Sequence, residues 1–180
     1  MTNYVILPGY TGSGETHWQT LWERQEPRMR RFSPSSWDAP DRDDWIAALD
    51  RMVGAAAGPC VLVAHSLSCL LVAQWAQLPG RAVAGAFLVA PPDPAAADFP
   101  RAEAAGFVDV PKQRIGFPTL IVASANDPYS TLDVQRKRAA DWGAGFIEIG
   151  ALGHINGSSG LGDWPEGRRL LQAFVTGLGV

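Results

Sequence analysis

The stretch that decides the fold runs Cys60-Val61-Leu62-Val63-Ala64-His65-Ser66-Leu67-Ser68-Cys69-Leu70-Leu71. Its first five residues are small or apolar and predict a buried strand, which breaks at His65-Ser66. An apolar helical pattern begins at once with Leu67, Leu70 and Leu71. A serine at so abrupt a turn projects its hydroxyl above the sheet, with the positive end and free N–H groups of the new helix beneath it. The stretch therefore predicts that Ser66 is a nucleophile.

Length and composition predict one globular domain over residues 1–180, long enough to bury a substantial core. The net charge of −3 offers no electrostatic basis for binding nucleic acid or an anionic membrane. No apolar run reaches the roughly 18 residues of a transmembrane helix, and the N-terminus lacks the features of a signal peptide. We therefore expect a cytoplasmic protein that binds neither nucleic acid nor membrane.

The cysteine and histidine positions predict no metal site. Cys60 and Cys69 lie on the predicted strand and the helix after it, so both are expected to be reduced core thiols. The three histidines lack the close spacing of metal ligands.

Short apolar runs alternate with helix-like stretches along the chain. Strands are predicted at about 3–8, 29–33 (a weak edge strand), 60–64, 84–90, 118–123 and 145–149. Helices are predicted at about 15–26, 42–57, 67–78, 131–142 and 164–177. The alternation implies right-handed βαβ units, an α/β fold and a parallel sheet covered on both faces. The proline-rich segment 91–117 is the least regular, and its length allows only a small cap over a site.

Two later residues supply what a serine nucleophile needs. A serine hydroxyl requires a base, usually histidine, and that histidine requires an acid to fix its tautomer. In chain order the acid precedes the histidine, and each follows a later strand. Asp127 follows the strand at 118–123 on a turn stiffened by Asn126 and Pro128, and His154 follows the strand at 145–149 on a glycine-flanked loop. Together with Ser66, these two residues form a predicted catalytic triad.

An oxyanion hole needs two N–H donors that already point at the site. We predict the N–H of Leu67 as one donor and that of Tyr10, in the loop after the first strand, as the other. Gly9 is expected to let this loop approach the substrate, and the hydroxyl of Thr11 or Ser13 to point into the site.

Aromatic side chains are expected to complete a substrate pocket. Tyr10 and Trp164, which lies ten residues after His154, are predicted to wall an acyl pocket. His65 borders the nucleophile and is a candidate residue of the substrate pocket, although its position favours a structural role in packing or hydrogen bonding near the elbow. His17 favours a role as a cap or brace for the glycine loop.

Several of these residues also have an alternative, purely structural interpretation. Ser66 would then be only a helix N-cap, Asp127 a turn residue and His154 a loop histidine bonded to backbone. The glycines after the first strand also suggest dinucleotide binding, with Asp38 beyond the second strand. Their spacing is G-x-x-G-x-G, whereas dinucleotide-binding proteins have G-x-G-x-x-G. The glycines that allow the tight turn and the close approach of the backbone to the phosphates would therefore lie at the wrong positions, which argues against dinucleotide binding.

Several short motifs occur together in this chain. They are Leu7-Pro8-Gly9-Tyr10, His17-Trp18-Gln19, Ala64-His65-Ser66-Leu67, Ser124-Ala125-Asn126-Asp127-Pro128-Tyr129, Gly153-His154-Ile155-Asn156 and 159–167. Together they resemble the small α/β hydrolases of the retinoblastoma-binding-protein-9 and YdeN type, from residue 4 to about residue 175.

The resemblance implies a minimal three-layer α/β-hydrolase fold, with a six-stranded, mostly parallel sheet in the order 2-1-3-4-5-6 and no large lid. It also implies that Ser66, Asp127 and His154 form the family's triad. The family usually has glycine two places after the nucleophile, whereas this chain has Ser68. A side chain there would either crowd the elbow or be tolerated.

The function predicted from these residues is a serine hydrolase that needs no cofactor or metal. It would cleave small carboxylic esters, or activated amides or thioesters, through an acyl-enzyme. The sequence does not separate a carboxylesterase from a thioesterase, an amidase or an aminopeptidase, because all use the same groups. The alternative is a protein-interaction module with a vestigial triad, a class suggested by the family's name. Substitution of Ser66 by alanine would abolish turnover in a serine hydrolase, whereas it would leave partner binding intact in an interaction module.

Overall fold

The structure is built on a parallel sheet whose six strands follow the order β2-β1-β3-β4-β5-β6. The computed structural model describes residues 2–180. The strands are β1 (Asn3–Leu7), β2 (Met29–Arg31), β3 (Cys60–His65), β4 (Gly85–Val89), β5 (Thr119–Ala123) and β6 (Gly145–Glu148). Every neighbouring pair is parallel. The predicted sheet and its strand order are confirmed.

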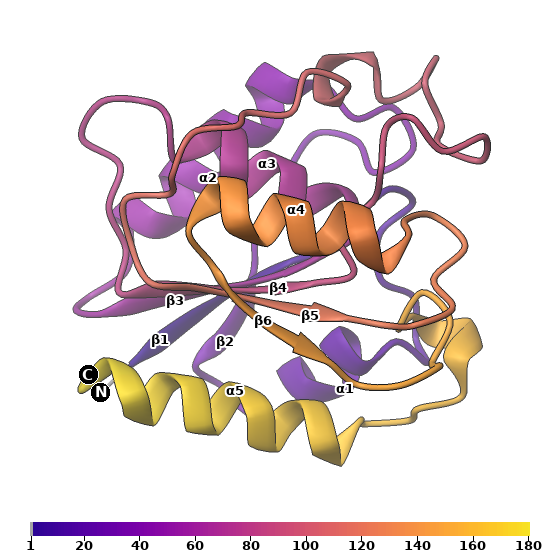
Figure 1. The fold of residues 1–180 in the computed structure, drawn as a ribbon. Coiled ribbons are helices and arrows are strands. Elements are labelled where there is room, and N and C mark those ends of the chain that lie inside the picture. Colours follow the sequence, from indigo (N-terminus) through magenta and orange to yellow (C-terminus); the bar gives the residue numbers. More distant parts are fainter. Residues whose placement is uncertain (1) are drawn as a thin grey trace.

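Helices cover both faces of this sheet and complete three layers (Figure 1). They are α1 (Trp18–Gln25), α2 (Arg42–Gly54), α3 (Leu67–Trp75), α4 (Leu132–Trp142) and α5 (Pro165–Leu178), with short 3₁₀ turns η1 (Ala105–Phe107) and η2 (Gly157–Ser159). The first helix begins later than predicted because the His17 side chain caps it by accepting a hydrogen bond from the Gln19 N–H. Within residues 2–180, no helix is both long enough and apolar enough to cross a membrane.

The central strands explain why the apolar runs are continuous. Side chains alternate across a strand, so β3 sends Leu62 and Ala64 to one face and Val61 and Val63 to the other. The first pair joins the core under α2, α3 and α4, and the second joins the core under α1 and α5. Because both faces are covered, every residue of β3 and β4 is buried.

The two cysteines lie within this core, as expected. Cys60 and Cys69 are free and buried. Burial raises the pKa of the Cys60 thiol to about 11, and it also raises the pKa of Cys69.

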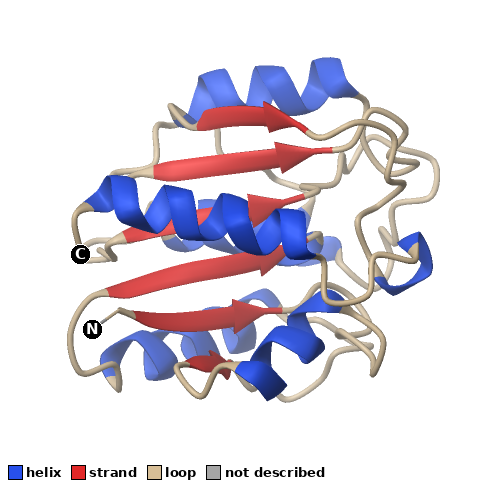
Figure 2. Ribbon diagram, turned by 90° about the horizontal axis from the view of Figure 1, so that it is seen from below, coloured by secondary structure: helices blue, strands red, loops and turns tan. Residues whose placement is uncertain are grey.

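The carboxyl ends of all six strands meet at one edge of the sheet (Figure 2). The loops after β1, β3, β5 and β6 therefore gather there, although they are far apart in sequence. Open parallel sheets bind ligands just outside this edge. The amino-terminal and carboxyl-terminal ends of the chain lie at the opposite edge (Figure 2).

The segment between β4 and β5 forms a small cap that is fastened to the body of the protein. Its Phe99 and Phe107 side chains are buried in the core. On α3, Gln74 Nε2 donates hydrogen bonds to the backbone carbonyls of Gly106 at 3.0 Å and Asp109 at 3.1 Å. The segment thus forms a small cap, as its length predicts.

A buried glutamine joins the two strands that lead into the predicted site. Gln19 is fully buried. Its Nε2 donates to the backbone carbonyls of Leu7, at 3.2 Å, and Val63, at 3.0 Å. Its Oε1 accepts a hydrogen bond from Ser13 Oγ at 2.6 Å. The side chain thus connects the ends of β1 and β3 to the loop between β1 and α1.

We expect Gln19→Leu to lower the free energy of unfolding by about 3 kcal/mol, because it leaves buried polar groups without partners. Urea denaturation measures the change. The matched control is Gln172→Leu at an exposed position of α5, which should change stability by less than about 0.5 kcal/mol. Similar unfolding midpoints for the two variants would contradict the role given to Gln19.

Candidate active site

The turn between β3 and α3 holds Ser66 in a strained conformation. Its φ is 54° and its ψ is −124°, a region that residues other than glycine rarely adopt. The turn is fixed by hydrogen bonds from the Ser66 N–H to the Val89 carbonyl at 3.0 Å and from the Cys69 N–H to the Ser66 carbonyl at 2.8 Å. The Ser66 side chain makes no capping bond to α3. The strain therefore serves to turn the hydroxyl away from the helix.

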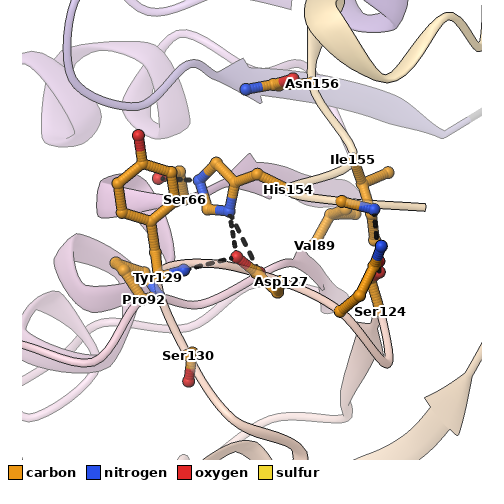
Figure 3. A network of polar contacts seen from close by, with 12 residues as sticks. Ser66, Val89, Pro92, Ser124, Asp127, Tyr129, Ser130, His154, Ile155 and Asn156 are labelled. Carbon is orange, nitrogen blue, oxygen red and sulfur yellow. Dashed lines mark hydrogen bonds and ion pairs between the residues drawn. The ribbon is translucent and has the colours of Figure 1, made fainter. Parts of the chain in front are cut away.

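The Ser66 hydroxyl points at a histidine that is paired with an aspartate (Figure 3). Ser66 Oγ lies 2.8 Å from His154 Nε2. On the other side of the ring, His154 Nδ1 lies 2.9 and 3.0 Å from the two carboxylate oxygens of Asp127. The carboxylate only accepts, so Nδ1 carries the proton and Nε2 is left to accept from the serine. The Asp127 side chain is 0% exposed, so water does not compete for this pair.

Hydrogen bonds join the loop that carries the aspartate to the loop that carries the histidine. Asn126 Oδ1 accepts from the Gly153 N–H at 2.7 Å, and Ser124 Oγ accepts from the Leu152 N–H at 2.9 Å. Asp127 itself accepts from the Tyr129 N–H at 2.9 Å. These bonds fix the carboxylate relative to the imidazole.

The two backbone N–H groups predicted to form an oxyanion hole, those of Leu67 and Tyr10, have no protein acceptor among residues 2–180. Leu67 is the first residue of α3, so its N–H has no acceptor within the helix. The loop after β1 lies against the elbow: a Cβ on Gly9 would be 2.8 Å from Ser66 Cβ and 3.2 Å from the Leu67 nitrogen. Only glycine permits this approach.

Ser68, which replaces the family's usual glycine, does not crowd the elbow. Its side chain is fully buried, and its Oγ donates a hydrogen bond to the Pro8 carbonyl at 2.5 Å. The hydroxyl thus ties α3 to the loop after β1, which carries Tyr10.

A cavity of about 500 Å³ opens above Ser66. Its walls combine apolar groups from the cap with polar groups from the loops after β1 and β6. The lining residues include Tyr10, Thr11, Thr16, His17, His65, Leu67, Pro92, Asp98, Phe99, Pro100, Tyr129, His154, Asn156 and Ser158. Among residues 2–180, no three histidine, cysteine or acidic side chains lie close enough together to hold a metal ion.

The prediction that Trp164 walls the pocket is wrong. The residue is only 1% exposed and is absent from the cavity wall. Its ring packs against Trp18, with centroids 5.2 Å apart, and stacks on Trp22 at 6.0 Å. Both partners belong to α1, on the face of the sheet that α5 also covers (Figure 1). Apolar burial therefore draws Trp164 into the core.

The loop after β1 divides its predicted pocket residues between the cavity and the interior. Tyr10 and Thr11 line the cavity, whereas Ser13 and Gly9 do not. Ser13 is buried and donates its hydroxyl proton to Gln19. Gly9 lies against the backbone of the elbow rather than along the substrate path.

Several cavity residues, Tyr129, Asn156, Pro92 and Phe99 among them, were not singled out from the sequence. Tyr129 packs on the His154 ring, with centroids 4.5 Å apart, and Asn156 lies two residues after that histidine. Both belong to the motifs that carry the family resemblance, so their positions were a usable signal. Pro92 and Phe99 come from the irregular cap segment, where no periodic pattern marks a residue as facing a cavity.

The two other histidines beside the site are held neutral. Burial, with a smaller effect from the positive charge of Arg31, lowers the pKa of His17 to about 3. Burial also lowers the pKa of His65 well below its usual value. His17 Nδ1 accepts from the Gln19 N–H at 3.2 Å, and His65 Nε2 bonds to the His154 carbonyl at 2.9 Å. Both rings have structural partners in the uncharged state.

A six-stranded parallel sheet with a strained serine turn after β3 places this protein among the α/β hydrolases. The family model for serine hydrolases matches residues 4–173, and the chain belongs to that family.

Solved structures agree with this placement. A YdeN-like hydrolase from Pectobacterium atrosepticum is 31% identical, with a TM-score of 0.87 over 99% of this chain and 92% of its own. The ydeN gene product of B. subtilis is 20% identical, with a TM-score of 0.79 over 98% of this chain and 100% of its own. An esterase domain from Rhodothermus marinus shares the fold at 14% identity, with a TM-score of 0.68 over 96% of this chain and 86% of its own. No curated protein matches the chain in sequence.

We expect stability to fall on acidification because the unfolded chain, but not the folded one, protonates His17 and His65 near pH 6.5. The unfolded state then binds more protons, so the His17 ring should cost about 2 kcal/mol of stability between pH 7 and pH 5, and the His65 ring should add a loss of the same sign. Urea unfolding at the two pH values measures the loss. His17→Gln, which cannot take up the proton, should show a smaller loss than the parent. Equal losses in the two proteins would contradict the neutral state assigned to His17.

Proposed function

We propose that this serine hydrolase cleaves small carboxylic esters through an acyl-enzyme on Ser66. The observation that carries the proposal is the continuous hydrogen-bonded row from Ser66 Oγ through the His154 ring to Asp127. It joins a nucleophile, a base and an acid at distances suited to proton transfer. The same groups would act on thioesters or activated amides.

In the proposed reaction, His154 Nε2 takes the hydroxyl proton as Ser66 Oγ attacks the carbonyl carbon. The negative oxygen that forms is held by the N–H groups of Leu67 and Tyr10. His154 returns the proton to the leaving group when the carbon–oxygen bond breaks. It then takes a proton from a water molecule, whose oxygen attacks the acyl carbon. His154 passes this proton to Ser66 Oγ as the bond between Oγ and the acyl carbon breaks, which releases the acid and restores the free enzyme. Asp127 keeps the ring oriented and stabilises its positive charge throughout, and no step requires a cofactor.

The size of the cavity favours short substrates. A space of about 500 Å³ accommodates a small ester, and the cap above it is fastened to α3. Phe99 and Pro100 of the cap offer an apolar surface for an acyl group, whereas Asn156 and Ser158 offer polar groups on the His154 loop. Because the leaving group must reach His154, this arrangement favours a short apolar acyl chain and a polar leaving group.

We expect a fluorophosphonate probe to label Ser66 stoichiometrically, because an activated serine attacks phosphorus as it attacks a carbonyl. Intact mass and peptide mapping locate the adduct. Ser66→Ala and His154→Ala should abolish labelling and lower ester turnover by about three or more orders of magnitude. The matched control is Ser33→Ala at an exposed position outside the cavity, which should label like the parent. A folded protein without an adduct would contradict the proposal and favour the interaction module.

The charges in the cavity make a second feature of the substrate testable. Asp98 at the exposed rim is the only acidic side chain in the lining, and no lysine or arginine lines the cavity within residues 2–180. An anionic substrate would therefore find no cation to pair with, whereas an ammonium group would find a carboxylate.

We expect kcat/KM for a choline ester to exceed that for its neutral 3,3-dimethylbutyl isostere by about two- to fivefold, the range of an exposed ion pair. Asp98→Asn should remove the preference, while Asp109→Asn, elsewhere on the cap, should keep it. Steady-state kinetics at low ionic strength measures the ratio. A ratio that Asp98→Asn leaves unchanged would exclude Asp98 as the source.

A further inference from the structure

The backbone just after His154 is held in a conformation that its sequence disfavours. Ile155 has a φ of 50°, in the left-handed region, where a β-branched residue is a clear outlier. Its side chain is fully buried, so burial opposes a change at this position. A strained backbone conformation persists only where several independent contacts with its surroundings hold it in place.

Two aromatic N–H groups supply that constraint from other elements. Trp18 Nε1, on α1, donates to the Ile155 carbonyl at 2.8 Å. His65 Nε2, at the end of β3, lies 2.9 Å from the His154 carbonyl. A carbonyl only accepts, so this ring nitrogen carries the proton. Consecutive carbonyls of the strained segment are thus each held by a buried side-chain donor.

We infer that Trp18 and His65 are positioning residues that hold the His154 ring in line with Ser66. The inference rests on the proposed function, since it assigns these residues to that reaction. Neither side chain needs to touch the reacting atoms. If either carbonyl were released, the peptide after His154 would relax toward a less strained conformation and carry the imidazole with it. The 2.8 Å contact between Ser66 Oγ and His154 Nε2 would be lost first.

The inference also explains why His17-Trp18-Gln19 forms one motif. Gln19 fixes the carbonyls of Leu7 and Val63, at the ends of the strands that lead to the oxyanion loop and to the elbow. Trp18 fixes the loop of the histidine, and His17 packs edge-on against His65 with centroids 4.7 Å apart. The start of α1 therefore holds three loops of the site in one arrangement.

A neighbouring tryptophan separates positioning from simple packing. Trp22 lies one turn further along α1, is equally buried, and stacks in the same cluster. Its Nε1 donates to the Asp163 carbonyl at 2.5 Å, nine residues beyond His154. Trp18→Phe and Trp22→Phe therefore remove the same atoms from the same core, but only the first frees the backbone at Ile155.

We expect Trp18→Phe to lower kcat for a p-nitrophenyl ester by about 10- to 100-fold, the loss typical of a slight misplacement of a reacting group. KM should stay within about twofold, because Trp18 does not line the cavity. Trp22→Phe should lose a similar amount of stability in urea denaturation while keeping kcat within about threefold. Equal kcat values for the two variants would overturn the inference.

The second positioning residue allows a rescue test. His65→Leu removes the donor to the His154 carbonyl, whereas His65→Gln keeps an N–H at a similar reach. We expect kcat to fall in the leucine variant and to recover in large part in the glutamine variant. Equal losses in both would overturn the role given to this hydrogen bond.

A spectroscopic readout distinguishes failure of the inference from failure of the proposed function. The proton on His154 Nδ1 is held by Asp127, so its proton NMR signal reports the position of the ring without any turnover. We expect the signal to stay sharp in the parent and in Trp22→Phe and to broaden in Trp18→Phe. That pattern in a protein that hydrolyses no ester would support positioning while rejecting the proposed function. An unchanged signal in Trp18→Phe would overturn the inference.

Discussion

The site depends on one geometric constraint, that all strands of the sheet run in the same direction. Their carboxyl ends must then share an edge, so the loops after β1, β3, β5 and β6 converge although more than a hundred residues separate the first from the last. The order of the strands sets which loops are neighbours. The aspartate and histidine loops follow adjacent strands and share backbone hydrogen bonds, which places a buried carboxylate against the imidazole.

Much of this arrangement could be predicted from the sequence, because the signals are local and strong. The change from an apolar strand to an apolar helix at Ser66 marks the elbow, and Asp127 follows the continuous apolar run of β5. Burial on both faces produces such runs, so they locate the strands directly. His154 follows the edge strand β6, which is partly exposed and contains Glu148, so its signal is weaker. Element ends were less accurate, since caps such as the His17 side chain decide them and leave little trace in periodicity.

The side-chain contacts that complete the site could not be predicted in the same way. Trp164 is close to His154 in sequence, but the left-handed turn at the start of α5 directs it into the aromatic cluster of α1. The hydrogen bond from Ser68 to Pro8 depends on how closely α3 approaches the loop after β1. Such distances are set by the packing of whole elements. A motif shows that a residue matters in a family without showing which neighbour it meets.

The burial of both cysteines has a practical consequence for chemical labelling. The chain contains two cysteines, and each lies in the core with a raised pKa, so neither presents a thiolate at neutral pH. A maleimide reagent would find no native target on the folded protein. One cysteine introduced on the cap would then carry a fluorophore at a single known position. The fluorophore would show whether that segment moves when substrate enters, without first removing any residue of the natural core.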